Sequence, residues 1–164
     1  MSKTSKSSQS KKRATGCCRF KMRRGITMDS AAGDSVMPRR MVNKDKIRKS
    51  PGSRRGLNYV AADNGRLPNV GEMDVDFTTL DGHDESWVFQ IADVNKPLGC
   101  VADRVDRSCR VVFDQDDETG QDLSYILKKK TGQVIKMRRT GKVWVLDAIV
   151  SSDLLATELF TRHG

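Results

Sequence analysis

The sequence predicts an all-β domain, a closed barrel or sandwich of short strands, that follows a basic N-terminal arm. Three observations support this prediction: short segments alternate apolar and polar residues, Gly-containing turns separate them, and the first third of the chain is rich in Lys and Arg. A chain of 164 residues has room for one domain of ordinary size and a tail. We therefore expect a disordered basic arm over residues 1–18, the β-domain over 19–150, and a short helix or tail over 151–164.

The positive charge of the chain is concentrated near its N-terminus. Residues 1–55 hold 17 Lys and Arg against three acids, whereas residues 56–164 hold 13 against 18, and the net charge is +9. A basic arm on a mildly acidic domain is typical of proteins that bind nucleic acid or anionic surfaces. The alternative is that a terminus rich in Lys and Ser is only soluble and disordered. The candidate nucleic-acid contacts of the arm are Lys3, Lys6, Lys11, Lys12 and Arg13.

The first expected strands lie between residues 20 and 61. Apolar residues from Phe20 to Met28 share one parity, with an interruption at Arg24, which is the alternation of a half-buried strand. A basic stretch with Pro, Gly and Ser over 43–56 predicts a loop. Residues 57–61 then predict a short strand.

Two hairpins are expected in the middle of the chain. Asp63, Asn64 and Gly65 predict the turn of the first, because Asn-Gly is favoured where both central residues adopt a positive φ. The second hairpin joins the alternating segments 73–79 and 87–91 through a polar stretch.

The last third of the chain predicts a short helix followed by further strands. Residues 101–107 are expected to be helical, with Val101 and Val105 on one apolar face. Ser and Asp residues before Leu154 predict the start of a small C-terminal helix. Strands separated by Gly-containing turns are expected at 111–113, 123–127, 134–137 and 143–150.

Several classes of function are excluded by what the sequence lacks. No apolar run approaches the ~20 residues of a spanning helix, so a membrane-embedded protein is not expected. The N-terminus lacks the apolar stretch of a secretory signal, and the four cysteines have neither a disulfide nor a zinc spacing, so we expect a cytoplasmic or nuclear protein. Phosphate-binding loop motifs are absent, and only His83 and His163 are available for nucleophilic catalysis. Carboxylate chemistry remains.

Asp29 differs from the other carboxylates in its sequence context. It directly follows the apolar segment 26–28, and small residues follow it up to Gly33. A sheet presents a carboxylate to a cleft at such a place, although an ordinary turn with its Asp bonded to nearby backbone N–H groups has the same sequence. The segment is therefore a hypothesis for a catalytic turn.

Three segments resemble, in order, the motifs of retropepsin-like aspartic proteases. MDSAAGDSVMP (28–38) resembles the active-site turn, YVAADNGRLPNVGEM (59–73) the region entering the flap, and WVFQIADVNKPLGCV (87–101) the segment ending in a hydrophobic residue and Gly. The span 26–150 is similar to protease-like segments of copia-type retrotransposon polyproteins. The resemblance covers about three quarters of the chain, and the order of its short motifs is more specific than any one of them.

The resemblance implies a retropepsin-like closed barrel with a flap hairpin, and an aspartic endopeptidase whose expected polypeptide substrate is its own polyprotein. It implies no metal and no cofactor. On this basis Asp29 is the catalytic residue, Ser30, Ala31, Ala32 and Gly33 support the active-site turn, Asp63, Asn64 and Gly65 belong to the flap or the substrate cleft, and Leu98 and Gly99 lie near the catalytic pair.

The family mechanism uses two aspartates that share one proton, one activating water and the other protonating the scissile carbonyl. Since this chain has one such turn, the resemblance implies a homodimer with one Asp29 from each subunit. The sequence departs from the family at Ala31, where a Gly is usual, and we expect its Cβ to crowd the site or to restrict the backbone. The alternative is a catalytically silent β-domain whose basic arm binds RNA, DNA or a host partner.

Overall fold

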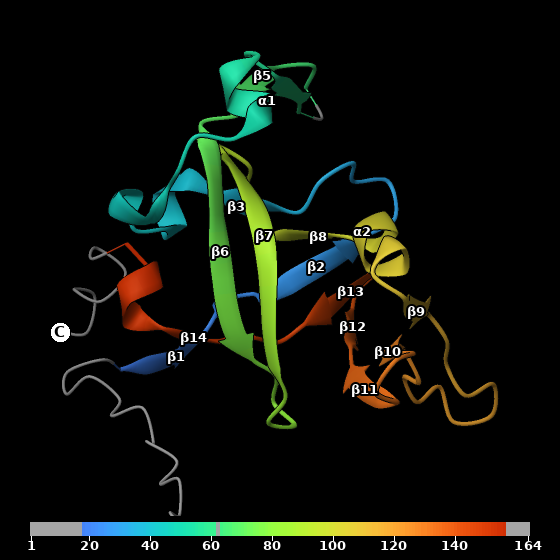
Figure 1. The fold of residues 1–164 in the computed structure, drawn as a ribbon. Helices are drawn as coiled ribbons and strands as arrows, with labels where there is room; N and C mark the ends of the chain where they lie inside the picture. The colour runs from blue at the N-terminus through green and yellow to red at the C-terminus, as the bar shows by residue number, and fades with distance from the viewer. Residues whose placement is uncertain (1–17, 62, 157–164) are drawn as a thin grey trace, which may run out of the picture.

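The computed structural model describes residues 18–61 and 63–156 (Figure 1), and these residues are mainly β. Their strands form one sheet of nine, one of three and one of two. The large sheet contains β1 (Arg19–Lys21), β2 (Ile26–Asp29), β3 (Val36–Pro38), β6 (Gly71–Thr78), β7 (Asp84–Ala92), β8 (Leu98–Cys100), β12 (Arg138–Thr140), β13 (Val143–Leu146) and β14 (Ile149–Ser151). The three-stranded sheet contains β9 (Cys109–Val112), β10 (Tyr125–Lys128) and β11 (Gln133–Lys136), and the small hairpin contains β4 (Asn58–Val60) and β5 (Arg66–Pro68). The helices are α1 (Pro51–Arg54) and α2 (Val101–Asp106), and the 3-10 turns are η1 (Arg39–Met41), η2 (Lys44–Lys46) and η3 (Ser152–Leu154).

The large sheet is a strongly curled half-barrel with the strand order β1-β14-β6-β7-β3-β8-β2-β13-β12. Its two end strands, β1 and β12, do not pair with each other, so the expected closure of the barrel is wrong for this sheet. Both end strands have only three residues, and β9, β10 and β11 form a separate sheet instead of extending the large one. The expected all-β class is confirmed.

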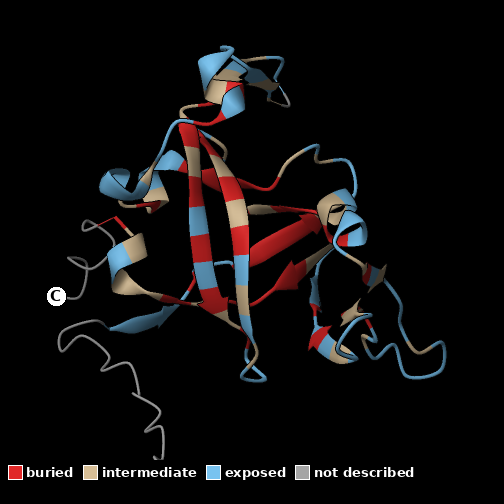
Figure 2. Ribbon diagram, viewed as in Figure 1, coloured by how far each residue is buried: buried red, intermediate tan, exposed pale blue. Residues whose placement is uncertain are grey.

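The long hairpin of β6 and β7 forms one wall of the core, and its strands were predicted from their alternation. Met73, Val75 and Phe77 of β6 are buried, while the residues between them face outward, as the alternating colours in Figure 2 show. On β7, Trp87 and Phe89 are buried beside them. The ring of Phe77 meets that of Trp87 edge-on, with 5.2 Å between centroids, so the two strands share one aromatic cluster.

Two predicted elements differ near the termini. The segment 143–150 is not one strand, because β13 ends before Asp147 and β14 starts at Ile149. The Asp147 carboxylate points inward and accepts two hydrogen bonds from the Arg138 guanidinium, at 2.8 and 3.2 Å, which breaks the ladder. The expected C-terminal helix is only the 3-10 turn η3, after which Leu155 is extended and bridges Val42. The remaining residues of that segment lie outside the described range.

The two helices also differ from the prediction made from the sequence. In α2, which was predicted, the inward side chain is Arg104 rather than the expected Val105, whose side chain is 52% exposed. The Arg104 guanidinium stacks on the Trp87 ring, 4.1 Å from its centroid, and this cation–π contact offsets part of the cost of its burial. The expected basic loop contains α1, because Ser50 and Ser53 form a reciprocal capping box that starts a helical turn at Pro51.

The inward-facing Asp147 generates a prediction. We expect Asp147→Ala to lower the free energy of unfolding by about 1–3 kcal/mol, because Arg138 loses both hydrogen bonds and the bend between β13 and β14 loses its anchor. Chemical denaturation measures the change. The matched control is Asp81→Ala in the exposed turn of the β6–β7 hairpin, which we expect to change stability by less than about 0.5 kcal/mol. Equal stabilities of the two variants would contradict the role of the Asp147 carboxylate.

Candidate active site

Asp29 is the last residue of β2, where the strand leaves the core. The preceding residues Ile26, Thr27 and Met28 are buried, and Asp29 itself is half-buried. β2 runs parallel to β8, and Asp29 lies opposite Cys100 at the end of that strand. Because parallel strands end at the same edge of a sheet, the loop after Asp29 and the start of α2 lie side by side there (Figure 1).

The same pairing places Leu98 and Gly99 beside Asp29. Thr27 lies opposite Leu98 and Met28 opposite Gly99. A Cβ on Gly99 would lie 2.6 Å from Met28 Sδ and 3.1 Å from a methyl carbon of Ile26. Gly99 is therefore the residue that lets β8 approach β2 this closely.

Hydrogen bonds from both strands hold the loop that follows Asp29. The Ala31 N–H donates to Asp29 Oδ1 at 2.8 Å. The Cys100 thiol donates to the Ala32 carbonyl at 3.0 Å, and the Cys100 N–H donates to Ser35 Oγ at 3.0 Å. Burial raises the pKa of the Cys100 thiol and keeps it protonated as a donor. The carboxylate therefore sits in a loop that is fixed at both ends.

Ala31 does not have the backbone restriction that the sequence predicted. It is exposed and is not among the residues with positive φ, so its Cβ causes no strain in this loop. Gly33 likewise has no positive φ, and a Cβ on it would meet nothing within 4 Å. Ser30 is exposed, and Ala32 is half-buried. Within one chain, Ala31 is accommodated without backbone strain.

The predicted hairpin around Asp63, Asn64 and Gly65 is present as β4 and β5, but its turn differs from the expected one. Asn64 has a φ of +63°, whereas Gly65 is not among the residues with positive φ, so the two-residue turn with both central residues at positive φ is wrong. The loop is longer: the Ala61 N–H donates to the Gly65 carbonyl at 2.8 Å. The Asp63 carboxylate accepts the Gly65 N–H at 2.9 Å, which stabilises the tip.

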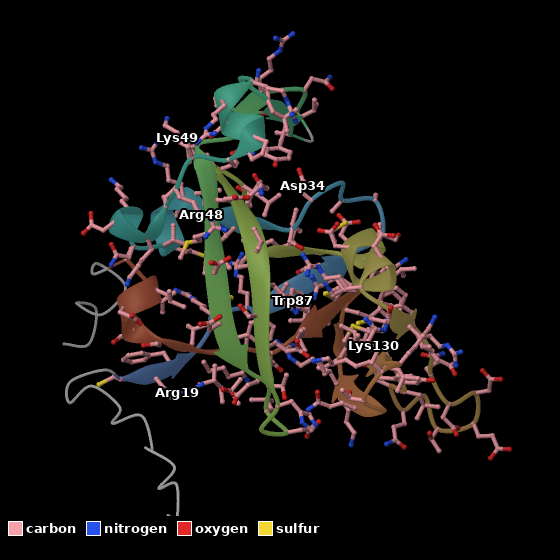
Figure 3. All side chains as sticks on the ribbon, in the orientation of Figure 1. Arg19, Asp34, Arg48, Lys49, Trp87 and Lys130 are labelled. Atoms are coloured by element: carbon pink, nitrogen blue, oxygen red, sulfur yellow. The ribbon has the colours of Figure 1, made fainter. Side chains whose placement is uncertain are left out.

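A hydrogen-bond chain joins this hairpin to the loop after Asp29. The Tyr59 hydroxyl of β4 donates to Asp34 Oδ2 at 2.9 Å and accepts from Asn69 Nδ2 at 3.2 Å. Asn69 Nδ2 also donates to Gln90 Oε1 of β7, at 2.8 Å. Burial and the bond to Asp34 raise the pKa of the Tyr59 hydroxyl. Asp34, which is labelled in Figure 3, is half-buried and fixes the hairpin to the loop.

These contacts could not be found from the sequence. Tyr59 and Asp34 are 25 residues apart, and neither stands in a motif that marks a polar contact. Asn69 was also missed, although it is buried just before β6 and its side-chain oxygen accepts the Gly71 N–H at 2.9 Å. The only sign of the burial of Asn69 in the sequence is its position between the apolar residues Pro68 and Val70.

Two surface hollows lie away from Asp29. One of about 420 Å³ is bordered by Arg19, Asp76 and Glu85, and one of about 220 Å³ by Phe113 and Trp144 among others. The described residues contain no group of three or more His, Cys, Asp or Glu side chains placed to hold a metal ion. In the same residues, no helix has the length and apolar composition needed to cross a membrane. The five arm residues Lys3, Lys6, Lys11, Lys12 and Arg13 lie outside the described range.

Comparison of the chain with protein-family models, with curated proteins and with solved structures found no match in any of the three.

The close approach at Gly99 generates a prediction. We expect Gly99→Ala to lower the free energy of unfolding by about 1–3 kcal/mol, because the new methyl group must displace Met28 and Ile26 in a packed core. Thermal unfolding measures it. The matched control is Gly33→Ala, four residues after Asp29. The methyl group added at Gly33 meets no atom within 4 Å. If both variants unfold at the same temperature, Gly99 is not needed for the contact of β2 with β8.

Proposed function

We propose that this chain is the subunit of a homodimeric aspartic endopeptidase, in which each subunit supplies Asp29. The observation that carries the proposal is the placement of Asp29: a carboxylate at the end of a buried strand, in a loop of small residues, beside the parallel strand that ends in Leu98-Gly99-Cys100. The motifs that resemble retropepsin-like proteases of copia-type polyproteins support it. A polypeptide, in the first instance the chain's own polyprotein, is the proposed substrate.

The proposed chemistry needs only the two carboxylates and a water molecule. Two Asp29 side chains in contact would hold one proton between them, because two like charges so close do not both ionise readily. The ionised carboxylate removes a proton from the water, which attacks the scissile carbonyl, while the protonated one donates to the carbonyl oxygen. The Ala31 N–H already donates to Asp29 Oδ1, which orients the carboxylate.

The second carboxylate is assigned to another subunit, and two further acids of the chain, Asp34 and Asp147, are engaged elsewhere. Asp34 accepts a hydrogen bond from Tyr59. Asp147 follows Leu146 of β13, which pairs with Ile26 at the start of β2. Asp147 therefore lies at the opposite end of β2 from Asp29, and it is bound by Arg138. A two-fold axis that passes beside Asp29 supplies the missing carboxylate.

This requirement restricts how two subunits meet. β12 is an edge of the large sheet, and it is separated from β2 by β13. Strands in a sheet are about 4.8 Å apart, so a dimer that pairs two copies of β12 would separate the two β2 strands by five spacings and leave the two Asp29 residues at least about 24 Å apart. The proposed dimer is therefore formed by the loops at the end of β2, where Ser30 is exposed and is assigned to bond across the axis. The β4–β5 hairpin is assigned as the flap.

The proposal predicts that Asp29→Asn abolishes cleavage of peptides at about pH 5, a loss of at least ~1,000-fold, because a neutral amide cannot act as the base. The amide has nearly the same shape, so the thermal unfolding temperature should not change. The control is Asp93→Asn, which removes an exposed carboxylate between β7 and β8. A pepstatin-type inhibitor should block the native protein.

Mixing experiments test the shared site separately. In an equal mixture of native and Asp29→Asn subunits that exchange freely, random pairing leaves about one quarter of the dimers with both carboxylates, so activity falls to about one quarter. A site contained in one subunit would keep about half. Cleavage retained by Asp29→Asn would overturn the aspartic mechanism. A native protein that stays monomeric and cleaves nothing would favour the silent β-domain.

A further inference from the structure

The folded domain carries a basic region of its own, apart from the N-terminal arm. Residues 39–66 contain nine Lys and Arg against two acids, whereas residues 67–164 contain 12 against 17. This basic segment forms η1, η2, α1 and the β4–β5 hairpin, which lie around one end of the β6–β7 hairpin (Figure 1). The charge of the domain is therefore divided in space as well as in sequence.

Three of these cations are already used inside the fold. Arg48 lies across β6, where its guanidinium donates to both oxygens of Asp74 at 2.8 and 3.0 Å (Figure 3). Lys46 pairs with Asp153 at 3.8 Å. Arg40 donates to the carbonyls of Val94 and Asn95. These side chains attach the segment to the rest of the domain.

The other cations have no carboxylate partner among the described residues. All six are exposed, and they are Arg39, Lys44, Lys49, Arg54, Arg55 and Arg66. Four of them lie in or next to α1 and the adjoining hairpin: Lys49 precedes the N-cap Ser50, Arg54 ends α1, Arg55 is its C-cap and Arg66 starts β5. We call these four the α1 basic patch. In Figure 3, Lys49 points outward, away from the sheet.

The backbone beneath the α1 basic patch is firmly held. Ser50 is buried and forms the capping box of α1, with bonds of 2.9 and 3.0 Å to Ser53. The Leu57 N–H donates to the Gly52 carbonyl at 2.9 Å, and the Asn69 N–H donates to the Leu57 carbonyl at 2.9 Å. The helix and the base of the hairpin are thus one unit. Cations on such a fixed frame lose less backbone freedom when a ligand binds.

We propose that the α1 basic patch binds the phosphate backbone of a nucleic acid duplex without regard to its base sequence. Three of its four cations are Arg, whose planar guanidinium donates two parallel hydrogen bonds to a phosphate. Base stacking needs exposed aromatic rings. The aromatic ring of this segment, Tyr59, is half-buried with its hydroxyl bound to Asp34. The patch therefore contacts phosphates rather than bases.

The shape of the patch favours nucleic acid over a membrane surface. Membrane-surface helices are long and bury one apolar face in the lipid. α1 is a single turn of Pro51, Gly52, Ser53 and Arg54, and the two exposed apolar side chains of the segment, Leu57 and Val60, lie outside it, so the segment forms no amphipathic helix. Duplex RNA and duplex DNA offer the same phosphate chemistry, so both are used as probes.

The test measures fluorescence anisotropy of labelled duplexes of about 20 base pairs with the full chain at several salt concentrations. The patch variant is Lys49→Gln/Arg54→Gln/Arg55→Gln. The matched control is Lys129→Gln/Lys130→Gln/Lys142→Gln, which removes three exposed cations elsewhere and leaves the same net charge. At about 0.1 M salt we expect the patch variant to bind at least tenfold more weakly and the control to bind within about threefold of the native chain. The slope of log affinity against log salt should fall by about 3 in the patch variant only.

Three results would overturn the proposal. Equal losses in the two variants would show that only net charge matters. Unchanged binding by the patch variant would place the affinity elsewhere, with the N-terminal arm as the first candidate. Loss of binding to vesicles of anionic phospholipid, with duplex binding unchanged, would assign the patch to a membrane. Circular dichroism of each variant confirms that the fold is retained, so that a loss of binding is not a loss of structure.

Discussion

The parallel contact between β2 and β8 is the constraint on which the rest of this structure depends. It requires a residue without a side chain at Gly99, because Met28 and Ile26 occupy the space that a Cβ would take. It aligns Asp29 with Cys100, whose thiol and N–H hold the loop after Asp29. It also fixes the start of α2, and hence the stacking of Arg104 on Trp87.

The sequence predicted the elements that have one buried and one exposed face. The β6–β7 hairpin is of this kind. The small hairpin was predicted from its Asn-Gly turn instead, and Asp29 from its place at the end of an apolar segment. β3 was missed because all three of its residues, Val36, Met37 and Pro38, are buried, so no alternation marks it. The break at Asp147 was missed because a charged residue before an apolar segment looks like an ordinary strand boundary, and its burial depends on Arg138 and Lys21, which are distant in the sequence or on another strand.

The candidate site was predictable only in part, because a sequence motif marks contacts between neighbouring residues but not contacts that the fold makes. Neighbours that are close in sequence, such as Asp29 and Ala31, form a local turn that a motif can mark. The bond between Tyr59 and Asp34 joins two segments that the fold brings together, and neither residue carries a local sign of its partner. The β4–β5 hairpin therefore belongs to both proposed sites: Tyr59 connects it to the loop of Asp29, and Arg66 places it in the α1 basic patch.

Among residues 18–61 and 63–156, β1 and β12 each pair with one strand only, so the half-barrel has two open edges. Exposed edges of this kind can recruit strands from other molecules and lead to fibrous aggregates. Here the edge strands have three residues each, and Arg19 on β1 and Arg139 on β12 place positive charge along them, whereas Lys21 and Arg138 pair with Asp147. Short edge strands that carry positive charge disfavour pairing between the edges of two copies, so the half-barrel can stay open without extending its sheet into another molecule.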